Sequence, residues 1–290
     1  MQRRELVRTG LFGVAAATAG AAHAAQDAAP AKKRLSENWD VVVVGAGFAG
    51  MCAALEAAER GAKTVLLEKN RPDGATVYSS GWIAAVGSRF QKNHPEDSPK
   101  AFFEDMMRLS HQRSDPELIK VYAEESGAGI DWLADHGTPF YLWEGLPAPE
   151  LSRCLISPGE GITGGSKLIR CLMAALEKKG VAIHYNTKAV SLVKDECFNV
   201  EGVSCITPEG RKDYLARGGV ILTTGGYGAN EAMVDKYIGP WASRLIVRGS
   251  PWITGENILM AEEVQALLVN MDQFYAGPIT PTGHCNPSPL

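Results

Sequence analysis

Three glycines follow a hydrophobic run at a spacing that suits dinucleotide binding. Residues 40–44 read Asp-Val-Val-Val-Val, and Gly45, Gly47 and Gly50 come directly after them. A tight turn at Gly45, an open backbone at Gly47 and close helix packing at Gly50 would place a pyrophosphate at a helix N-terminus. Glu68 follows about 20 residues later, where a carboxylate accepts hydrogen bonds from a ribose hydroxyl pair and disfavours a 2′-phosphate.

The segments around these glycines have the order that such a site requires. The run 40–44 predicts a buried strand, the Ala-rich stretch after Gly50 predicts a helix, and 65–68 predicts a second strand. The alternative is a chance combination of these features in an unrelated α/β protein. Four features at the required spacing favour the dinucleotide site.

Two later segments carry small and hydroxyl side chains suited to the same ligand. Residues 69–81 are rich in both and follow the second strand directly. Residues 219–222 predict another buried strand, which runs into Thr-Thr-Gly-Gly at 223–226. That Gly-Gly pair is equally compatible with a plain bend. A glycine-rich stretch at 157–166 either holds an anion or turns the chain, and we favour the turn.

Length and composition restrict the class of protein. The chain has 290 residues, 45% hydrophobic and 21% charged, which suits one large globular domain or two small ones. The formal net charge of −4 gives no electrostatic footprint for a nucleic-acid partner. The six cysteines and six histidines lack the spacing of a metal site, a redox dithiol or a haem attachment, so no metal is predicted. Cys197 and Cys205 are a remote candidate for a hairpin disulfide.

The N-terminal residues predict an export signal. Arg3 and Arg4 precede an apolar, small-residue run and an Ala-x-Ala cleavage site at 22–24. We assign 1–24 to a signal of the twin-arginine type, although the usual Ser or Thr before the pair is missing. Residues 25–37 are interpreted as a flexible leader. The mature protein is therefore expected in the periplasm without a membrane span, and a frayed basic terminus is the alternative.

The remaining patterns complete an α/β fold. Helical spacing predicts an insertion of two or three helices at 98–137, with a helix start at Asp115-Pro116. The sequence also predicts helices at 167–179 and 256–268, strands at 182–185, 189–194, 200–206 and 213–216, and a hairpin turn at 208–210. We expect a Rossmann-like domain over 38–270, with a parallel central sheet and a small antiparallel excursion near 198–216. Residues 271–290 are expected to form an irregular tail.

Taken together, these motifs resemble one protein family. They are Val-Val-Val-Gly-Ala-Gly-x-Ala-Gly at 42–50, the Glu68-Lys69 pair, Gly74-x-Thr76 with Ser80-Gly81, and Thr-Gly-Gly-Tyr at 224–227. They resemble the FAD-dependent fumarate reductase and succinate dehydrogenase flavoproteins, in particular the soluble branch. That branch holds flavocytochrome c fumarate reductases, urocanate reductases, tricarballylate dehydrogenases and ketosteroid dehydrogenases. The match runs from Asp40 to Pro278 and is specific for the family, not for the substrate.

The resemblance implies noncovalent FAD as the cofactor, because the family's membrane-bound branch has an attachment histidine near 76–79 and this chain has none there. In the family pattern the first three glycines hold the pyrophosphate, Glu68 binds the adenosine ribose, and Ala189 contacts adenine through its backbone. The residues expected around FAD are Gly45, Ala46, Gly47, Ala49, Gly50, Glu68, Lys69, Ala75, Thr76, Ser80, Gly81, Ala189, Thr224, Gly225, Gly226 and Glu256.

The chain departs from the family pattern in three places. Gly-Glu-Asn at 255–257 stands where relatives often have Gly-Asp-Gly, and Ala-Gly at 276–277 stands where many place a substrate-facing histidine. Relatives also continue into a capping domain, which is largely absent here and would only begin at 271. That domain supplies the arginine proton donor and most of the carboxylate clamp, so the catalytic residues are unknown. Arg244, Arg248 and His284 are the late basic residues, and none aligns with a catalytic position.

The activity implied by the resemblance is hydride transfer between the flavin N5 and a small unsaturated or saturated organic acid. We therefore expect an exported FAD-dependent oxidoreductase acting on CH–CH groups, with a separate periplasmic electron-transfer partner such as a c-type cytochrome. Two alternatives stay open. One is a truncated flavin-binding fragment without catalysis, which the Pro-rich ending favours. The other is an NAD-dependent dehydrogenase, which suits the first glycine motif but not the later loops.

Overall fold

The computed structural model describes residues 35–70, 74–92, 97–143, 153–159, 163–245, 247 and 249–273. The chain divides into two compact units, Met1–Lys33 and Arg34–Leu290, and every described residue belongs to the second. The predicted export signal at 1–24, most of the predicted leader and residues 274–290 lie outside the described ranges. The predicted division of the chain into these segments therefore stays a prediction.

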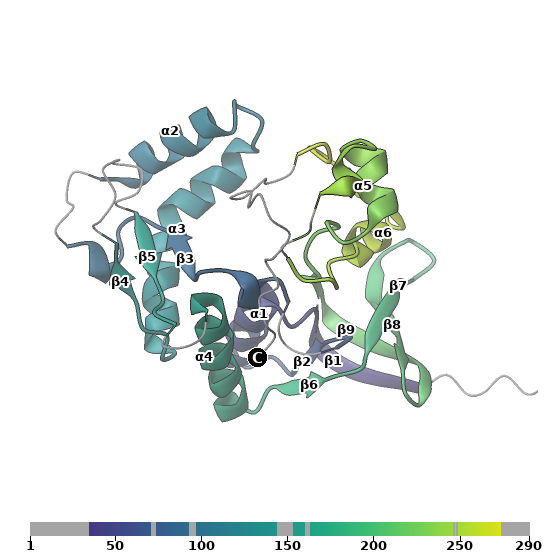
Figure 1. Cartoon of the computed structure of the whole chain (residues 1–290). Helices are drawn as coiled ribbons and strands as arrows, with labels where there is room; N and C mark the ends of the chain where they lie inside the picture. The colour runs from purple at the N-terminus through teal and green to yellow at the C-terminus, as the bar shows by residue number, and fades with distance from the viewer. Residues whose placement is uncertain are drawn as a thin grey trace, which may run out of the picture. The chain divides into compact units, whose positions relative to one another are not determined.

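A six-stranded sheet in the order β6-β2-β1-β9-β8-β7 forms the centre of this unit (Figure 1). Its strands are β1 (Leu35–Val44), β2 (Thr64–Leu67), β6 (Ala182–His184), β7 (Lys188–Lys194), β8 (Val200–Thr207) and β9 (Gly210–Leu222). The pairs β6-β2, β2-β1 and β1-β9 are parallel, whereas β9-β8 and β8-β7 are antiparallel. The α/β fold class with a parallel centre and an antiparallel excursion is thereby confirmed.

Both faces of the sheet are buried at residues 42–44 of β1 and 64–67 of β2, which explains the uninterrupted hydrophobic runs there. Successive side chains of a strand point to opposite faces. Val43 and Leu66 belong to the core that the helices α1 (Phe48–Glu59) and α4 (Gly164–Lys179) cover, and the two helices contact each other. The side chains of Val42, Val44, Val65 and Leu67 belong to the second core with residues of β7, β8 and β9.

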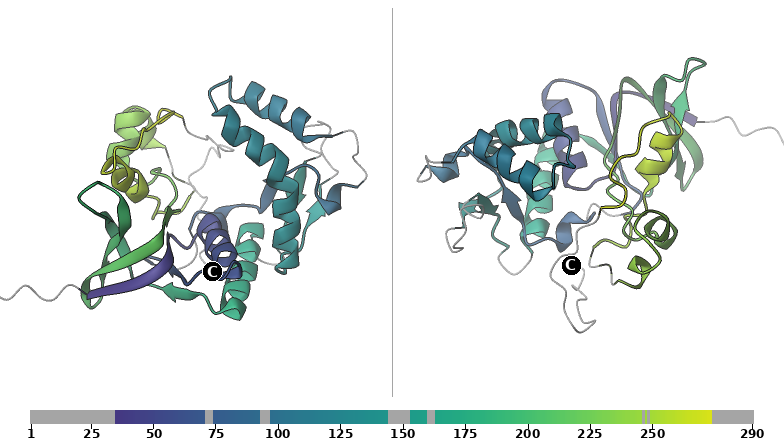
Figure 2. Two further views of the ribbon diagram at one scale, coloured as in Figure 1. Left: turned by 180° about the vertical axis from the view of Figure 1, so that it is seen from behind. Right: turned by 90° about the horizontal axis from the view of Figure 1, so that it is seen from above.

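The predicted helical insertion consists of α2 (Pro99–Leu109) and α3 (Pro116–Asp135), which run side by side (Figure 2). Each helix starts at a proline and has a side-chain cap. The Ser98 hydroxyl accepts the Ala101 N–H, and the Asp115 carboxylate accepts the amides of Glu117 and Leu118. The predicted start at Asp115-Pro116 is confirmed.

Several elements were not predicted. The short strands β3 (Trp82–Ala84), β5 (Cys154–Ile156) and β4 (Tyr141–Leu142) form a second, antiparallel sheet, and the helices without a prediction are η1 (Thr76–Tyr78), η2 (Arg89–Gln91), α5 (Glu231–Tyr237) and η4 (Ala242–Arg244). The last helix, α6 (Glu256–Glu262), was predicted with a longer range. Strands of two or three residues are too short to display an alternating pattern. No helix within the described residues combines the length and apolar character needed to cross a membrane.

Two strand boundaries need correction. β1 begins at Leu35, inside the range predicted as leader, because residues 35–39 pair with 212–216 of β9. The strands predicted at 213–216 and 219–222 are one continuous strand, β9. Its glycines at 218–219 do not end the strand: they lie where the pairing register with β1 shifts. Glycine inside a strand is typical of such bulges.

Two helix boundaries and one disulfide also need correction. α4 begins at Gly164 rather than Lys167, because the Thr163 hydroxyl caps it through the Ser166 N–H. The final helix ends at Glu262 rather than at 268, because Gln265 has a φ of 61°, a left-handed backbone conformation that a helix does not accommodate, and Leu267 is 86% exposed. In the described structure, the remote candidates for a disulfide, Cys197 and Cys205, are both free thiols.

Candidate functional site

A cavity of about 390 Å³ lies where the carboxyl ends of β1, β2 and β9 meet the following loops. Open α/β sheets bind ligands at this edge. Of the residues predicted around FAD, the ones that line the cavity are Gly45, Gly47, Ala49, Glu68, Lys69, Ala75, Thr76, Ala189, Thr224, Gly225, Gly226 and Glu256. The structure brings these residues together from segments spread over some 200 positions of the chain, and their contact with FAD stays a prediction.

Glycine is required at the three motif positions for different physical reasons. Gly45 has a φ of 104°, and a Cβ there would lie 2.7 Å from the Thr223 carbonyl oxygen. A Cβ at Gly50 would lie 1.9 Å from the Gly45 carbonyl oxygen. Gly47 differs, because no atom of the described residues lies within 4 Å of a Cβ placed on it. Gly45 and Gly50 therefore let the chain pack on itself, while Gly47 keeps space open beside the cavity.

The N-terminus of α1 offers hydrogen-bond donors at this space. Gly47 is its N-cap residue and has no side-chain acceptor, and the first turn holds no acidic residue. Backbone N–H groups of a first helical turn need acceptors from outside the helix. Together with the positive end of the helix dipole they favour an anionic ligand such as a pyrophosphate.

Glu68 is buried at the cavity wall, with 8% of its surface exposed. Its carboxylate oxygens accept the backbone N–H groups of Ala46 and Asn70, each at 2.8 Å. These bonds fix the carboxylate in one orientation. Ala46, predicted as a cofactor residue, is fully buried and acts through this bond to Glu68.

Three more predicted residues are not among the lining residues of the cavity. Gly50 lies against the turn at Gly45, as described above. Ser80 and Gly81 approach the start of α4, where a Cβ on Gly81 would lie 2.6 Å from the Gly164 carbonyl carbon. These residues shape the loop 74–81 that carries Ala75 and Thr76 to the cavity.

Lys69 and Glu256 form an ion pair across the cavity wall, with 2.6 Å between Lys69 Nζ and Glu256 Oε1. Burial acts to raise the pKa of Glu256, but hydrogen bonds from Lys69 and Thr254 outweigh it and leave that pKa below its ordinary value. The carboxylate is therefore ionised at neutral pH. Lys69 Nζ also donates to the Trp252 carbonyl oxygen at 2.7 Å.

Two acceptor atoms in or beside this pair lack a hydrogen-bond donor among the described residues. Glu256 Oε2 and Asn257 Oδ1 are buried and have no hydrogen-bond partner among the described residues. A buried acceptor without a donor costs about 1–3 kcal/mol. A ligand with hydroxyl or amino donors would satisfy Glu256 Oε2, since Glu256 lines the cavity. The donors at α1 and the acceptors at Glu68 and Glu256 fit the pyrophosphate and hydroxyl groups of FAD.

Sequence reasoning missed one wall of the cavity. Ser250, Trp252 and Ile253 line it, and they lie just before Glu256 in the chain. A large aromatic residue within a Pro- and Gly-containing loop was the only local signal. The pairing of this loop with Lys69 spans more than 180 residues, and no sequence pattern reports it.

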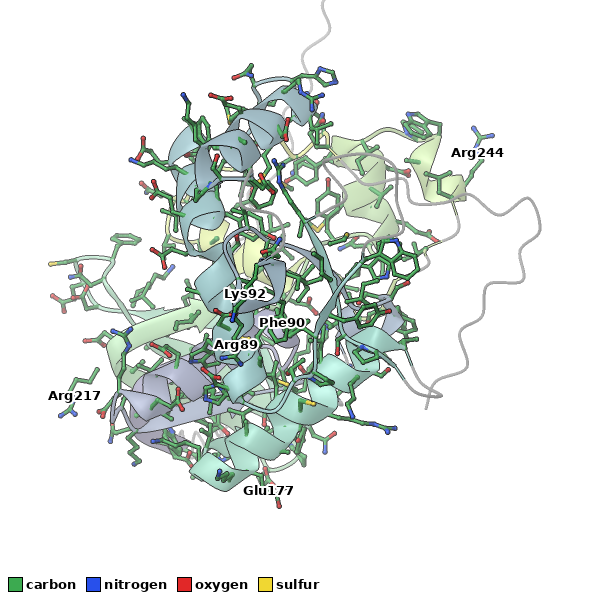
Figure 3. All side chains as sticks on the ribbon, turned by 90° about the vertical axis from the view of Figure 1, so that its left-hand side faces the viewer. Arg89, Phe90, Lys92, Glu177, Arg217 and Arg244 are labelled. Carbon is green, nitrogen blue, oxygen red and sulfur yellow. The ribbon has the colours of Figure 1, made fainter. Side chains whose placement is uncertain are left out.

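Of the late basic residues named above, Arg244 falls within the described ranges. Arg244 is exposed, and its side chain projects away from the ribbon (Figure 3). Arg248 and His284 lie outside the described residues. The described ranges hold no group of three or more His, Cys, Asp or Glu side chains suited to a metal ion.

Comparison with known proteins identifies the family of this site. The family model described as "FAD binding domain" matches residues 40–288. A probable fumarate reductase of Shewanella frigidimarina is 31% identical over 245 residues, which cover 84% of this chain and 41% of that protein. A urocanate reductase of Eggerthella lenta is 35% identical over 260 residues, covering 87% and 42%. The chain thus spans about two-fifths of the length of these relatives.

Solved structures agree with this family. The 3-ketosteroid-Δ4-(5α)-dehydrogenase of Rhodococcus jostii has a TM-score of 0.76 and 29% identity, covering 83% of this chain and 56% of that one. The open conformation of a flavocytochrome c3 fumarate reductase has a TM-score of 0.72 and 32% identity, covering 79% and 41%.

Proposed function

The chain belongs to the FAD binding domain family, and on that premise we propose that it is an exported oxidoreductase of the fumarate reductase type. Its cofactor is FAD, which sets aside the NAD-dependent alternative. The proposed reaction transfers hydride between the flavin and a carbon–carbon bond of a small organic acid. The observation that carries the proposal is a single cavity lined by Gly47, which leaves open space, and by the acidic residues Glu68 and Glu256.

The relatives support this class of reaction. They include proteins named as fumarate, urocanate, vinyl phenol and acrylate reductases. All four named compounds contain a carbon–carbon double bond, although only some are carboxylic acids of similar size. The shared chemistry is therefore reduction of an activated double bond, and the substrate of this chain is proposed only as a class.

The residues of this chain bind and orient the cofactor. Bound flavin supplies the hydride donor and acceptor. The first turn of α1 would donate hydrogen bonds to the pyrophosphate, and Glu68, held by Ala46 and Asn70, would accept hydrogen bonds from the adenosine ribose. Glu256 stays ionised beside Lys69 and offers Oε2 to a further donor of the cofactor. No residue of this chain is assigned as the proton donor.

Export and the electron partner are further parts of the proposal. Arg3 and Arg4 with the cleavage motif at 22–24 support transport by the twin-arginine route. A separate periplasmic carrier such as a c-type cytochrome would exchange electrons with the flavin. Replacing both arginines by lysine should retain the protein in the cytoplasmic fraction, and unchanged export would contradict this route.

The substitution Gly47→Ala tests the cofactor site directly. Its backbone, with φ of −78° and ψ of −177°, accepts alanine, and the Cβ meets no described atom. The stability of the cofactor-free protein should therefore stay within about 0.5 kcal/mol of wild type. FAD affinity should fall at least tenfold, because the methyl group enters the space assigned to the pyrophosphate.

Gly50→Ala is the matched contrast for this test. Its Cβ would lie 1.9 Å from the Gly45 carbonyl oxygen, so it should destabilise the protein before any cofactor is added. Urea unfolding measures stability, and titration calorimetry with FAD measures affinity. Wild-type FAD affinity in the Gly47→Ala protein would refute the pyrophosphate assignment.

An activity assay separates the enzyme from a flavin-binding fragment. The FAD-loaded chain is mixed with a chemically reduced viologen dye and with fumarate, urocanate or acrylate. Dye oxidation that depends on one of these acids is the expected result. A loaded, folded chain that oxidises no dye with any of them would favour the fragment without catalysis.

A further inference from the structure

The residues that line the cofactor cavity include an exposed tryptophan, Trp252. Trp252 lines the cavity and keeps 50% of its surface exposed, whereas Ser250, two residues earlier, has only 1% of its surface exposed. Trp82 and Trp241 are exposed to 49% and 52%, but neither is among the described residues that line the cavity. Exposure alone is common for tryptophan. Exposure on the wall of a ligand cavity points to the ligand.

The backbone of Trp252 is fixed from several sides. Its carbonyl oxygen accepts a hydrogen bond from Lys69 Nζ at 2.7 Å, and its N–H donates to the Ser250 hydroxyl at 3.2 Å. The next carbonyl, that of Ile253, accepts the Ala229 N–H at 3.1 Å. Lys69 is itself held by the ion pair with Glu256. The indole is therefore carried on an anchored segment rather than on a loose loop.

These anchors place Trp252 at the adenosine end of the cavity. Lys69 directly follows Glu68, the carboxylate expected at the adenosine ribose. Lys188 and Ala189 line the same cavity from β7. The base attached to that ribose would therefore lie in the same cavity as Ala189 and Trp252, near the end that Glu68 marks.

We propose that Trp252 forms an aromatic wall for the adenine base and makes the site selective for FAD over flavins that lack adenosine. Polar groups of the cavity serve the pyrophosphate and hydroxyl groups, but a flat base gains most from a flat apolar surface. Stacking of a base on an aromatic side chain is sequence-tolerant and strong enough to govern affinity. The proposal rests on FAD as the cofactor, and Lys69 acts here as a positioning residue for Trp252.

Affinities of the full chain for FAD, ADP and FMN test this proposal by titration calorimetry. Trp252→Ala should lower the affinity for FAD and for ADP by about tenfold to a hundredfold, the usual range for a lost stacking partner. FMN binding, which needs no adenine contact, should change less than about twofold. Trp252→Phe should retain most of the affinity, and Trp241→Ala, the equally exposed control, should bind all three ligands like wild type.

Tryptophan fluorescence gives a second readout. ADP absorbs no emitted light, so quenching by ADP reports contact with an indole. Wild type and Trp241→Phe should be quenched, while Trp252→Phe should bind ADP with little quenching.

Three results would overturn the proposal. They are unchanged FAD and ADP affinity in Trp252→Ala, an equal loss of FAD and FMN affinity, or full quenching in Trp252→Phe. Wild-type protein that binds neither FAD nor ADP would instead overturn the cofactor site itself, and the role of Trp252 with it.

Discussion

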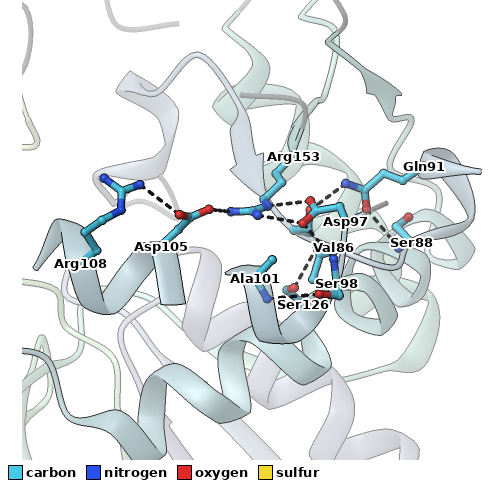
Figure 4. A network of polar contacts seen from close by, with 11 residues as sticks. Val86, Ser88, Gln91, Asp97, Ser98, Ala101, Asp105, Arg108, Ser126 and Arg153 are labelled. Carbon is cyan, nitrogen blue, oxygen red and sulfur yellow. Dashed lines mark hydrogen bonds and ion pairs between the residues drawn. The ribbon is translucent and has the colours of Figure 1, made fainter. Parts of the chain in front are cut away.

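The Arg153 cluster of the helical insertion and the Lys69–Glu256 pair of the cofactor cavity are both buried ion pairs, but they are completed differently. Arg153 bonds both carboxylate oxygens of Asp97, at 2.6 and 2.8 Å, and reaches Asp105 at 2.7 Å (Figure 4). The other oxygen of Asp105 accepts Arg108. Only 6% of the Arg153 side chain is exposed, and its guanidinium lies over the Phe102 ring. Every carboxylate oxygen in this cluster has a donor.

The Lys69–Glu256 pair is somewhat less buried, with 22% and 17% of the two side chains exposed. One oxygen of Glu256 is bonded by Lys69 and Thr254, and the other has no partner among the described residues. A buried cluster in which every acceptor has a donor within the protein can stabilise the fold without a ligand. A buried cluster with an unsatisfied oxygen in a residue of a cavity wall is a candidate for completion by a ligand, because an unsatisfied buried oxygen is costly.

The largest expected effect comes from breaking the complete cluster. Arg153→Met leaves two carboxylates without their shared cation and should lower the free energy of unfolding by about 3–5 kcal/mol. FAD affinity of the folded fraction should not change, because Arg153 is not among the described cavity residues. Urea unfolding checks the first statement and FAD titration the second.

Arg108→Met is the matched control for that experiment. Arg108 bonds the same Asp105 but is 58% exposed, so its loss should cost less than about 1 kcal/mol. Equal stability of the Arg153 and Arg108 variants would contradict the structural role of the cluster.

An intermediate effect is expected at the incomplete pair. Lys69→Met removes the hydrogen bond that counters burial at Glu256, so the pKa of Glu256 should rise. In wild type that pKa is lowered. The stabilisation from Glu256 is therefore present when the pH is above the pKa of the unfolded state, about 4.5. It is lost as the pH falls through the lower pKa of the folded state. The variant should lose about 1–3 kcal/mol at neutral pH, with a weaker acid dependence.

Thermal unfolding with and without FAD measures this effect between about pH 3 and 7. FAD should raise the midpoint less in Lys69→Met than in wild type, whereas Arg153→Met should retain the full FAD-dependent rise. The same FAD-dependent rise in both variants would remove the distinction between the two clusters.

The sequence predicts those parts of the fold and of the site whose residues lie close together along the chain. The glycine turn, the strand before it and the helix after it are local, so their spacing predicts them. The cap at Asp115-Pro116 is local too. The Glu68 carboxylate was predicted because its separation from the turn is fixed by one strand–helix–strand unit.

The rest depends on contacts between distant segments. Lys69 and Glu256 are 187 positions apart, and Arg153 lies 56 positions from Asp97. Neither pairing leaves a periodic pattern. The glycines at 164–165 were interpreted as a turn, yet they form the start of α4, which Thr163 caps. A Cβ on Gly165 would lie 1.8 Å from the Thr76 carbonyl oxygen. Packing between segments, not local flexibility, requires glycine there.

The smallest expected effect concerns a contact whose completeness depends on pH. His136, which follows α3, lies 2.8 Å from Glu59 of α1 through Nε2 and 2.7 Å from the Trp132 carbonyl oxygen through Nδ1. Both partners are acceptors, so only the protonated ring can donate to both. Burial acts to lower the pKa of His136, but these hydrogen bonds outweigh it and raise that pKa above its usual value.

The sign of the pH dependence follows from that raised pKa. The contact stabilises fully below the unfolded value of about 6.5 and is lost as the pH rises through the folded value. Because the pair is partly exposed, the change should stay under about 1 kcal/mol. His136→Gln should abolish the decline of stability from about pH 6 to 8, measured by urea unfolding. A decline of the same size in the variant would mean that another group causes it. Unlike the Arg153 cluster, this contact is then complete only while the imidazole is protonated.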